Sequence, residues 1–143
     1  MSEPEEIKDA LIDAINDHDL EALLRCYSPQ AVLVSPSGMA EGHDQISSFY
    51  GYFFEALPDL RVTPWSVIER GDGRVHEWCL SATHMGPFLV PGGGVLEPTG
   101  RKVNIRVCSV RTVENGLTLS HRYYFDQLEL FVQLGAALSF EEG

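Results

Sequence analysis

Apolar residues recur at helical spacing through the first 60 residues, and this pattern predicts three helices. The first is expected near the N-terminus, with Ser2 as its cap and Glu5 three residues later. Asp19 is placed to cap a second, short helix that Ser28-Pro29 ends. A third helix is expected to start at 42–44 and to end at Pro58. The three apolar stripes are Ile7, Ala10, Leu11, Ala14 and Ile15; Leu20, Leu23, Leu24 and Tyr27; and Ile46, Phe49, Tyr50, Phe53 and Leu57.

From residue 60 onward the pattern changes to strands. Long strands are predicted over 60–70, 74–85, 101–113 and 117–125, a short one over 31–34, a Gly/Pro-rich loop over 86–100, and a last short helix from Asp126 to Gly135. Helices followed by a strand meander indicate an α+β fold rather than alternating βαβ units. We therefore predict one domain over 1–143, in which N-terminal helices pack on a strongly curved antiparallel sheet, as in a cone-shaped barrel, and enclose a pocket.

The charge of the chain is acidic and unevenly distributed. The 143 residues contain 10 Lys and Arg against 21 Asp and Glu, for a net charge of −11. Residues 1–60 contribute 12 acids and 2 bases, whereas residues 61–143 contribute 9 acids and 8 bases. An acidic chain without a basic cluster repels phosphate backbones and anionic lipid surfaces. We expect neither a nucleic-acid nor a membrane partner.

Three cysteines, Cys26, Cys79 and Cys108, lie far apart and form no C-x-x-C pair. This pattern favours free thiols in a reducing compartment over a disulfide framework. The acidic start of the chain differs from the cationic start of a signal peptide, and no apolar run approaches the length of a membrane span. The expected location is cytoplasmic.

Five segments, taken in order, carry a family resemblance: His76-Glu77-Trp78, the run from Ala82 to Phe88, Glu97-Pro98-Thr99-Gly100-Arg101, Tyr124-Phe125-Asp126 and Gln133-Leu134-Gly135. Together they resemble the SnoaL-like polyketide cyclase family of the nuclear-transport-factor-2-like superfamily. The resemblance implies a deep pocket closed by the first helices, and intramolecular aldol chemistry without a metal or organic cofactor. It implies that Asp126 is the base that removes a proton next to a carbonyl. The family's cyclases also use a His from the preceding strand, and 101–113 contains none.

The residues themselves leave a second role open for Asp126. It stands at a strand-to-helix junction with Glu129 three residues later, which is the pattern of a helix cap. A carboxylate bonded to helix amides has a lowered pKa and is a poorer base. The cap and the base are therefore competing interpretations of this position.

The turn at Glu114-Asn115-Gly116 decides which side chains accompany Asp126. A three-residue loop, which separates polar from apolar side chains more cleanly, pairs Val113 with Leu117. It places Asn104, Arg106 and Cys108 on one face with Arg122, Tyr124 and Asp126. A two-residue loop would bring Ile105 and Val107 to that face instead.

Other candidate site residues have structural alternatives. Asn104, Arg106 and Arg122 are expected to hold an enolate or a carboxylate, or else to be exposed polar residues. His84 is a candidate proton shuttle or an anchor for the following loop. Tyr50, Phe53, Trp65 and Trp78 are expected to line an aromatic pocket or to be ordinary core, and 91–94 is a flap or a plain loop. No His spacing indicates a metal site.

Three functions are compatible with these patterns. The first is a cofactor-free cyclase or isomerase acting on a small apolar or aromatic carbonyl compound, with Asp126 and His84 catalytic and Tyr50, Trp65, Trp78, Asn104, Arg106, Arg122 and Tyr124 binding the substrate. The second is a non-catalytic domain that binds such a ligand. The third is an interaction domain. In each case the bare outer face of the sheet predicts a homodimer.

Overall fold

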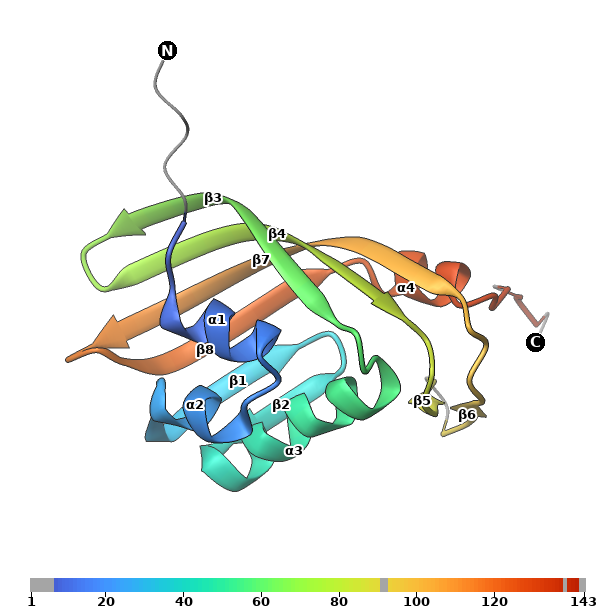
Figure 1. The fold of residues 1–143 in the computed structure, drawn as a ribbon, viewed down its shortest axis with the longest axis horizontal. Helices are drawn as coiled ribbons and strands as arrows, with labels where there is room; N and C mark the ends of the chain where they lie inside the picture. Colours follow the sequence, from blue (N-terminus) through green and yellow to red (C-terminus); the bar gives the residue numbers. More distant parts are fainter. Residues whose placement is uncertain (1–6, 91–92, 138, 142–143) are drawn as a thin grey trace, which may run out of the picture.

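The computed structural model describes residues 7–90, 93–137 and 139–141. Three helices, α1 (Ala10–Asn16), α2 (Leu20–Arg25) and α3 (Gly42–Ala56), lie on one side of a curved sheet, and α4 (Gln127–Gln133) follows the last strand (Figure 1). This arrangement confirms the predicted α+β fold with helices packed on a mostly antiparallel sheet.

The main sheet has six strands in the order β2-β1-β8-β7-β4-β3. Every neighbouring pair is antiparallel except β1 and β8, which run parallel. The edges formed by β2 and β3 stay apart, so the sheet is strongly curved but open rather than closed into a barrel. Its strands are β1 (Tyr27–Ser35), β2 (Gly38–Glu41), β3 (Arg61–Arg70), β4 (Gly73–Thr83), β7 (Lys102–Glu114) and β8 (Leu117–Phe125).

Carboxylates fix where the first two helices begin. Asp9 accepts hydrogen bonds from the backbone N–H groups of Leu11 (2.9 Å) and Ile12 (3.3 Å), so α1 begins after Asp9. The predicted cap at Ser2 lies outside the described residues. Asp19 caps α2 as predicted, by accepting from the N–H of Ala22 at 3.1 Å.

The N-terminal strands are more extensive than the pattern predicts. β1 covers Tyr27–Ser35 rather than 31–34, and it includes Pro29. The register with β8 is irregular between Tyr27 and Val32, and this irregularity accommodates a residue that has no N–H to donate. Two further short strands, β5 (Phe88–Leu89) and β6 (Val95–Leu96), pair within the predicted loop over 86–100.

The predicted three-residue turn between β7 and β8 is wrong. Glu114 pairs with Leu117, so Asn115 and Gly116 alone form the turn, both with positive φ. A bulge follows at once, because Thr112 pairs with Ser120 while Val113 pairs with Thr118. The bulge moves the register by one residue. Cys108 therefore lies opposite Tyr124, and the two share a face as the three-residue turn would have required.

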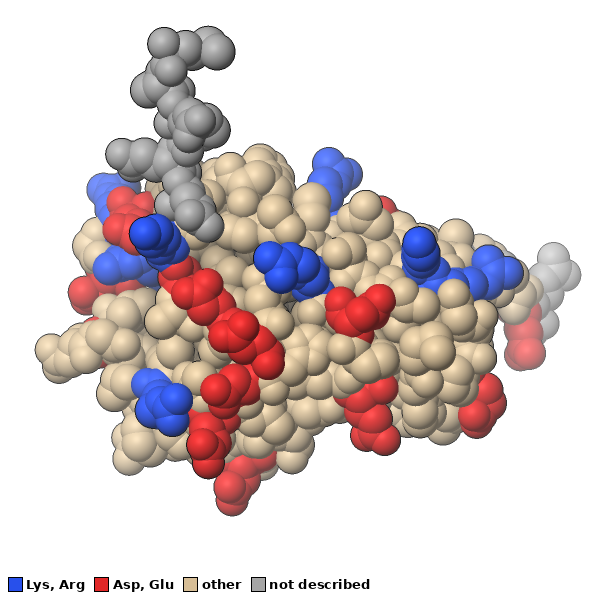
Figure 2. All heavy atoms as spheres, in the orientation of Figure 1, with Lys and Arg blue, Asp and Glu red and all other residues tan. Residues whose placement is uncertain are grey.

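Charge follows the two halves of the fold. Acidic side chains gather over α1 and α2, and basic ones lie mainly along the sheet (Figure 2). The helices in the described segments are too short or too polar to cross a membrane.

Candidate functional site

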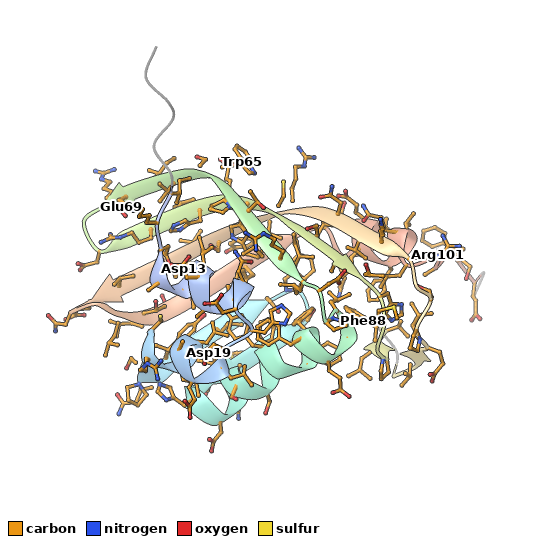
Figure 3. The ribbon with its side chains drawn as sticks, in the orientation of Figure 1. Asp13, Asp19, Trp65, Glu69, Phe88 and Arg101 are labelled. Atoms are coloured by element: carbon orange, nitrogen blue, oxygen red, sulfur yellow. The ribbon has the colours of Figure 1, made fainter. Side chains whose placement is uncertain are left out.

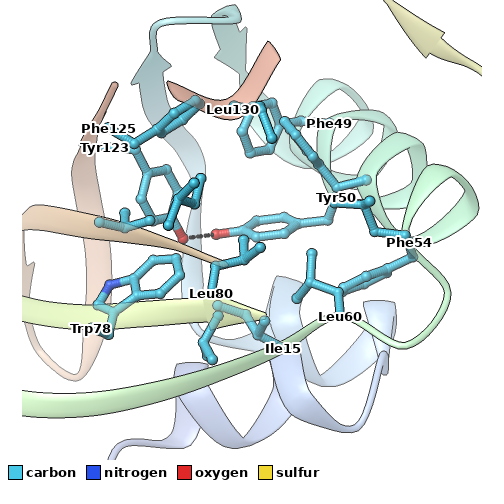
Figure 4. Close-up of a pocket in the computed structure, with 15 residues that line it drawn as sticks. Ile15, Phe49, Tyr50, Phe54, Leu60, Trp78, Leu80, Tyr123, Phe125 and Leu130 are labelled. Carbon is cyan, nitrogen blue, oxygen red and sulfur yellow. Dashed lines mark hydrogen bonds between the residues drawn. The ribbon is translucent and has the colours of Figure 1, made fainter. Parts of the chain in front are cut away.

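An apolar cavity lies between the helices and the inner face of the sheet (Figure 4). Its volume of about 60 Å³ exceeds the ~10–15 Å³ that one water needs. The lining side chains are aliphatic or aromatic and come from α1, α3, α4 and four strands, with two from the turn after α3: Ile15, Phe49, Tyr50, Phe53, Phe54, Leu57, Leu60, Val62, Trp78, Leu80, Ile105, Val107, Tyr123, Phe125 and Leu130. The predicted pocket between the two layers is therefore present.

Two tyrosine hydroxyls meet at this cavity. The hydroxyl oxygens of Tyr50, from α3, and Tyr123, from β8, are 2.5 Å apart (Figure 4). Burial is the main cause that raises the pKa of both phenols well above the usual value. Both side chains are consequently neutral at physiological pH, and each carries a hydrogen-bond donor.

The hydroxyl pair is the end of a longer buried chain of hydrogen bonds. Tyr27, the first residue of β1, places its hydroxyl 2.7 Å from that of Tyr50 and 2.7 Å from Nδ1 of His121. His121 lies two residues before Tyr123 on β8, so both side chains point inward. Burial, reinforced by the positive charge of Arg111, holds the pKa of His121 well below its usual value.

Beneath α1 this chain of hydrogen bonds lies next to a buried cluster of charged side chains. Asp9 forms an ion pair with Arg111, and its carboxylate lies 3.6 Å from Nε2 of His76. Arg111 also reaches the hydroxyl of Thr118 at 3.4 Å. Burial lowers the pKa of His76, although the Asp9 carboxylate acts in the opposite direction. The fold thus places a cation, its carboxylate partner and two imidazoles next to the tyrosine chain.

Of the substrate-binding residues predicted from sequence, Tyr50 and Trp78 line the cavity, as does Phe53. Trp65 is 54% exposed and points away from the helices (Figure 3). It stands beside the irregularity in the register of β3 with β4, between Pro64 and Ser66.

The predicted polar group lies on the outer face of the sheet. Asn104, Arg106, Arg122 and Tyr124 are exposed there, because their strand positions alternate with the inward Ile105, Val107 and Tyr123. The expectation that this group faces the cavity is wrong. These residues do share one face of the sheet, as predicted, but the opposite, apolar face encloses the cavity.

Asp126 caps α4, as the structural interpretation requires. Its carboxylate accepts from the N–H of Glu129 at 3.1 Å, and the residue is exposed and is not part of the cavity lining. The expected contacts with the cavity, Arg106 and Asn104 are not among its hydrogen bonds in the described residues.

His84 anchors the segment after β4. Its Nδ1 accepts from the N–H of Thr99 at 3.2 Å and lies 2.9 Å from the Thr99 hydroxyl. The side chain is fully buried but is not part of the cavity lining. Within the described ranges, no three His, Cys, Asp or Glu side chains gather in a way that could hold a metal ion.

Sequence reasoning missed Tyr27, His121, Arg111 and Asp9 as site residues. A signal was available for two of them. Arg111 continues an inward face of β7 that begins with Val103, Ile105 and Val107, and His121 alternates with Tyr123 on β8. The position of Tyr27 could not be inferred, since its contact with His121 spans 94 residues of sequence.

Comparison with known proteins places this geometry in a family. The profile of the SnoaL-like domain matches residues 9–121, which include the charged cluster and most of the cavity lining but end before Tyr123, Phe125 and Leu130. The chain belongs to this family. A search of the curated proteins with this sequence found no match.

Solved structures share the fold across nearly the whole chain. A candidate SnoaL-like polyketide cyclase from Jannaschia sp. CCS1 is 25% identical, with a TM-score of 0.78 over 90% of this chain and 88% of that one. IdmH, a candidate polyketide cyclase from Streptomyces antibioticus, is 24% identical, with a TM-score of 0.73 over 89% and 94% of the chains. A protein with a ketosteroid isomerase-like fold from Catenulispora acidiphila is 17% identical, with a TM-score of 0.75 over 90% and 91%.

Proposed function

We propose that this SnoaL-like domain binds a small apolar or aromatic carbonyl compound in the cavity and catalyses cofactor-free proton transfer on it, leading to isomerisation or ring closure. The observation that carries the proposal is the Tyr50–Tyr123 hydroxyl pair, because both side chains line the cavity and their hydroxyl oxygens lie just beneath its wholly apolar surface, where a small side-chain movement would bring one to a ligand. Its family membership and its structural similarity to the two candidate cyclases support the same class of reaction.

The hydroxyl pair is suited to a carbonyl oxygen that becomes negative. Removing a proton next to a carbonyl moves charge onto the oxygen, and a neutral phenol donates a stronger hydrogen bond to that enolate than to the ketone. The apolar walls contributed by Trp78 and Phe125 exclude water, which strengthens this interaction further. Loss of one such donor costs about 10²-fold or more in rate in comparable sites.

Asp126 remains our proposal for the proton acceptor, on the resemblance of Tyr124-Phe125-Asp126 to the family. Its neighbour Phe125 lines the cavity, so the backbone at this point reaches the site. Its carboxylate is held by the N–H of Glu129. Acting as a base requires the carboxylate to leave that hydrogen bond and turn toward the cavity.

Exchange of protons for deuterium tests the proposed chemistry without knowledge of the natural substrate. The unmodified protein is incubated with 1-indanone in D2O, and loss of the C2 proton signal is followed by NMR. We expect exchange above the buffer rate, a fall of about 10²-fold in Tyr123→Phe, and little change in Tyr124→Phe. Tyr124 is the matched control because its ring lies on the outer face. A Tyr123→Phe variant as active as Tyr124→Phe would contradict the role of the hydroxyl pair.

A ligand-binding domain without catalysis is the second candidate. It is favoured by the composition of the cavity lining, which contains neither a carboxylate nor an imidazole among the described residues. Saturable binding of 1-indanone, measured by calorimetry, without any exchange above buffer would support this function.

Exchange that persists in Asp126→Asn would exclude Asp126 as the acceptor.

We also propose that the chain forms a homodimer through the outer face of the sheet. Trp65 and Tyr124 expose 54% and 55% of their surface there, which is unusual for aromatic residues. Sedimentation equilibrium should give twice 15.9 kDa, and Trp65→Lys should shift the population toward monomer. A monomer across the accessible concentration range would refute this assembly.

A further inference from the structure

One ring nitrogen of the tyrosine–histidine chain is unaccounted for. Nε2 of His121 is fully buried and has no hydrogen-bond partner among the described residues. His121 lines a second cavity of about 10 Å³, enough for one water, together with charged and polar side chains. A buried polar atom without a partner destabilises the folded state.

The charges around this cavity bear on where the neutral ring carries its proton. Arg111 lies directly opposite His121 in the register of β7 and β8, which brings side chains on one face to about 5 Å. Asp9, from the residue before α1, is already engaged by Arg111 and by two α1 N–H groups. His76, from β4, lies against the same carboxylate. The guanidinium of Arg111 lines the same cavity as His121, and a cation near Nε2 would stabilise a lone pair there and disfavour an N–H.

We propose that one water in the second cavity accepts from Arg111 and donates to Nε2 of His121, so that the neutral imidazole carries its proton on Nδ1. The site is defined by Arg111, His121 and the Asp9 carboxylate that holds the guanidinium in place. His121 and Arg111 are positioning residues in this scheme, since neither lines the apolar cavity.

This tautomer directs the whole chain of hydrogen bonds. His121 Nδ1–H donates to the oxygen of Tyr27, Tyr27 donates to Tyr50, and Tyr50 donates to Tyr123, over contacts of 2.7, 2.7 and 2.5 Å. The hydroxyl proton of Tyr123 then has no acceptor within the chain of hydrogen bonds, and a small rotation would offer it to a ligand in the adjoining apolar cavity. With the proton on Nε2 every bond reverses, and Tyr123 can no longer donate to a ligand without breaking the chain.

The directed chain selects the chemical class of the ligand. An oxygen that carries negative charge, such as an enolate or a phenolate, accepts the Tyr123 hydrogen bond and polarises the donors behind it. No covalent bond changes and no proton is transferred in this binding step. The inference rests on the proposed function only in taking the cavity as the ligand site.

The tautomer can be read directly in the unmodified protein. Nitrogen NMR of protein labelled with ¹⁵N-histidine distinguishes a ring nitrogen that carries a proton from one that does not. We expect His121, assigned by its loss in His121→Asn, to show a protonated Nδ1 and an unprotonated Nε2 at pH 7.5. A proton on Nε2 would overturn the proposal, whatever the protein binds.

Ligand preference gives an independent test. Fluorine NMR measures binding of 4-fluorophenol, which can ionise, and of 4-fluoroanisole, which cannot. We expect the phenolate to bind more tightly than the anisole, and Tyr27→Phe to reduce that preference by about 3- to 10-fold, as expected for the loss of one neutral hydrogen bond behind the Tyr123 donor. Tyr52→Phe is the matched control, because the Tyr52 hydroxyl accepts from the N–H of Leu89 and is not part of the chain.

The outcomes separate this inference from the proposed function. Equal losses of both probes in Tyr27→Phe would overturn the directed chain while leaving the cavity as a ligand site. If neither probe binds, the cavity function fails, and the nitrogen spectrum still decides the tautomer. Should Tyr27→Phe fail to fold, that same spectrum of the unmodified protein remains decisive.

Discussion

Replacing Asp9 by alanine removes three interactions at one position. The carboxylate caps α1 through Leu11 and Ile12, forms the ion pair with Arg111, and lies beside His76. The side chains of Asp9 and Arg111 are only 15% and 8% exposed, so water cannot replace the lost partner. Asp9→Ala leaves the guanidinium buried and without its counter-charge.

The cost follows from two separable contributions. Breaking a buried ion pair by removing one partner costs about 3–5 kcal/mol, and losing a carboxylate cap costs about 1 kcal/mol. We therefore expect Asp9→Ala to lower the free energy of unfolding by about 4–6 kcal/mol, a large share of the ~5–15 kcal/mol available to a domain. Asp9→Asn keeps an oxygen for the cap and should lose about 1 kcal/mol less.

Urea denaturation followed by circular dichroism measures these differences. Asp13→Ala is the matched control, because it removes an exposed carboxylate from the same helix and should change stability by less than about 0.5 kcal/mol. In Asp9→Ala/Arg111→Met the orphaned charge is gone, so most of the loss should be recovered. An Asp9→Ala variant as stable as Asp13→Ala would refute the reasoning.

Three further predictions concern other parts of the fold. Asp126→Asn should leave the melting temperature unchanged, because Asn also accepts from the N–H of Glu129, whereas Asp126→Ala should cost about 1 kcal/mol. Gly86→Ala should destabilise the protein, since its Cβ would meet the Glu55 carbonyl oxygen at 2.3 Å. Gly51→Ala within α3 meets nothing closer than 3.9 Å and should stabilise the protein by about 0.5–1 kcal/mol. Chemical denaturation of both variants measures the sign of each change. Folding lowers the pKa of His121, so below pH ~6.5 the unfolded chain binds more protons than the folded one. The free energy of unfolding is therefore full above pH ~6.5 and falls below it by up to ~1.4 kcal/mol per pH unit. Melting curves at pH 7.5 and 5.5 should differ less in His121→Asn than in the unmodified protein.

The sequence carried the element order and the position of the pocket, because both depend on local patterns. The stripe of Phe49, Tyr50 and Phe53 identified the inner face of α3 without any knowledge of its partners. Alternation along β7 and β8 likewise separated the inward residues from the outward ones. The predicted faces were correct although the predicted turn was not, because the bulge at Leu119 shifts the register so that Cys108 and Tyr124 again share a face.

The polar part of the site could not be predicted in the same way. Alternation says which residues share a face, but not which face is covered by the helices. Arg106 and Arg122 therefore looked as suitable for the site as Arg111, which is the one that is buried. The partners of Arg111 and His121 come from segments about 100 residues away, and no local pattern encodes such contacts.

The parallel pairing of β1 with β8 has a consequence for how the protein is made. Tyr27 belongs to the first strand and His121 to the last, so 94 residues separate two partners of one hydrogen bond. The Asp9–Arg111 pair spans 102 residues. The Asp9–Arg111 pair cannot form until β7 has left the ribosome, and the Tyr27–His121 contact must wait for β8, which also supplies Tyr123 and Phe125 to the cavity wall. Contacts of such long sequence separation slow folding and prolong the exposure of apolar surface. Newly synthesised chains should therefore keep apolar surface exposed until β8 is available, and the cavity should take shape only then.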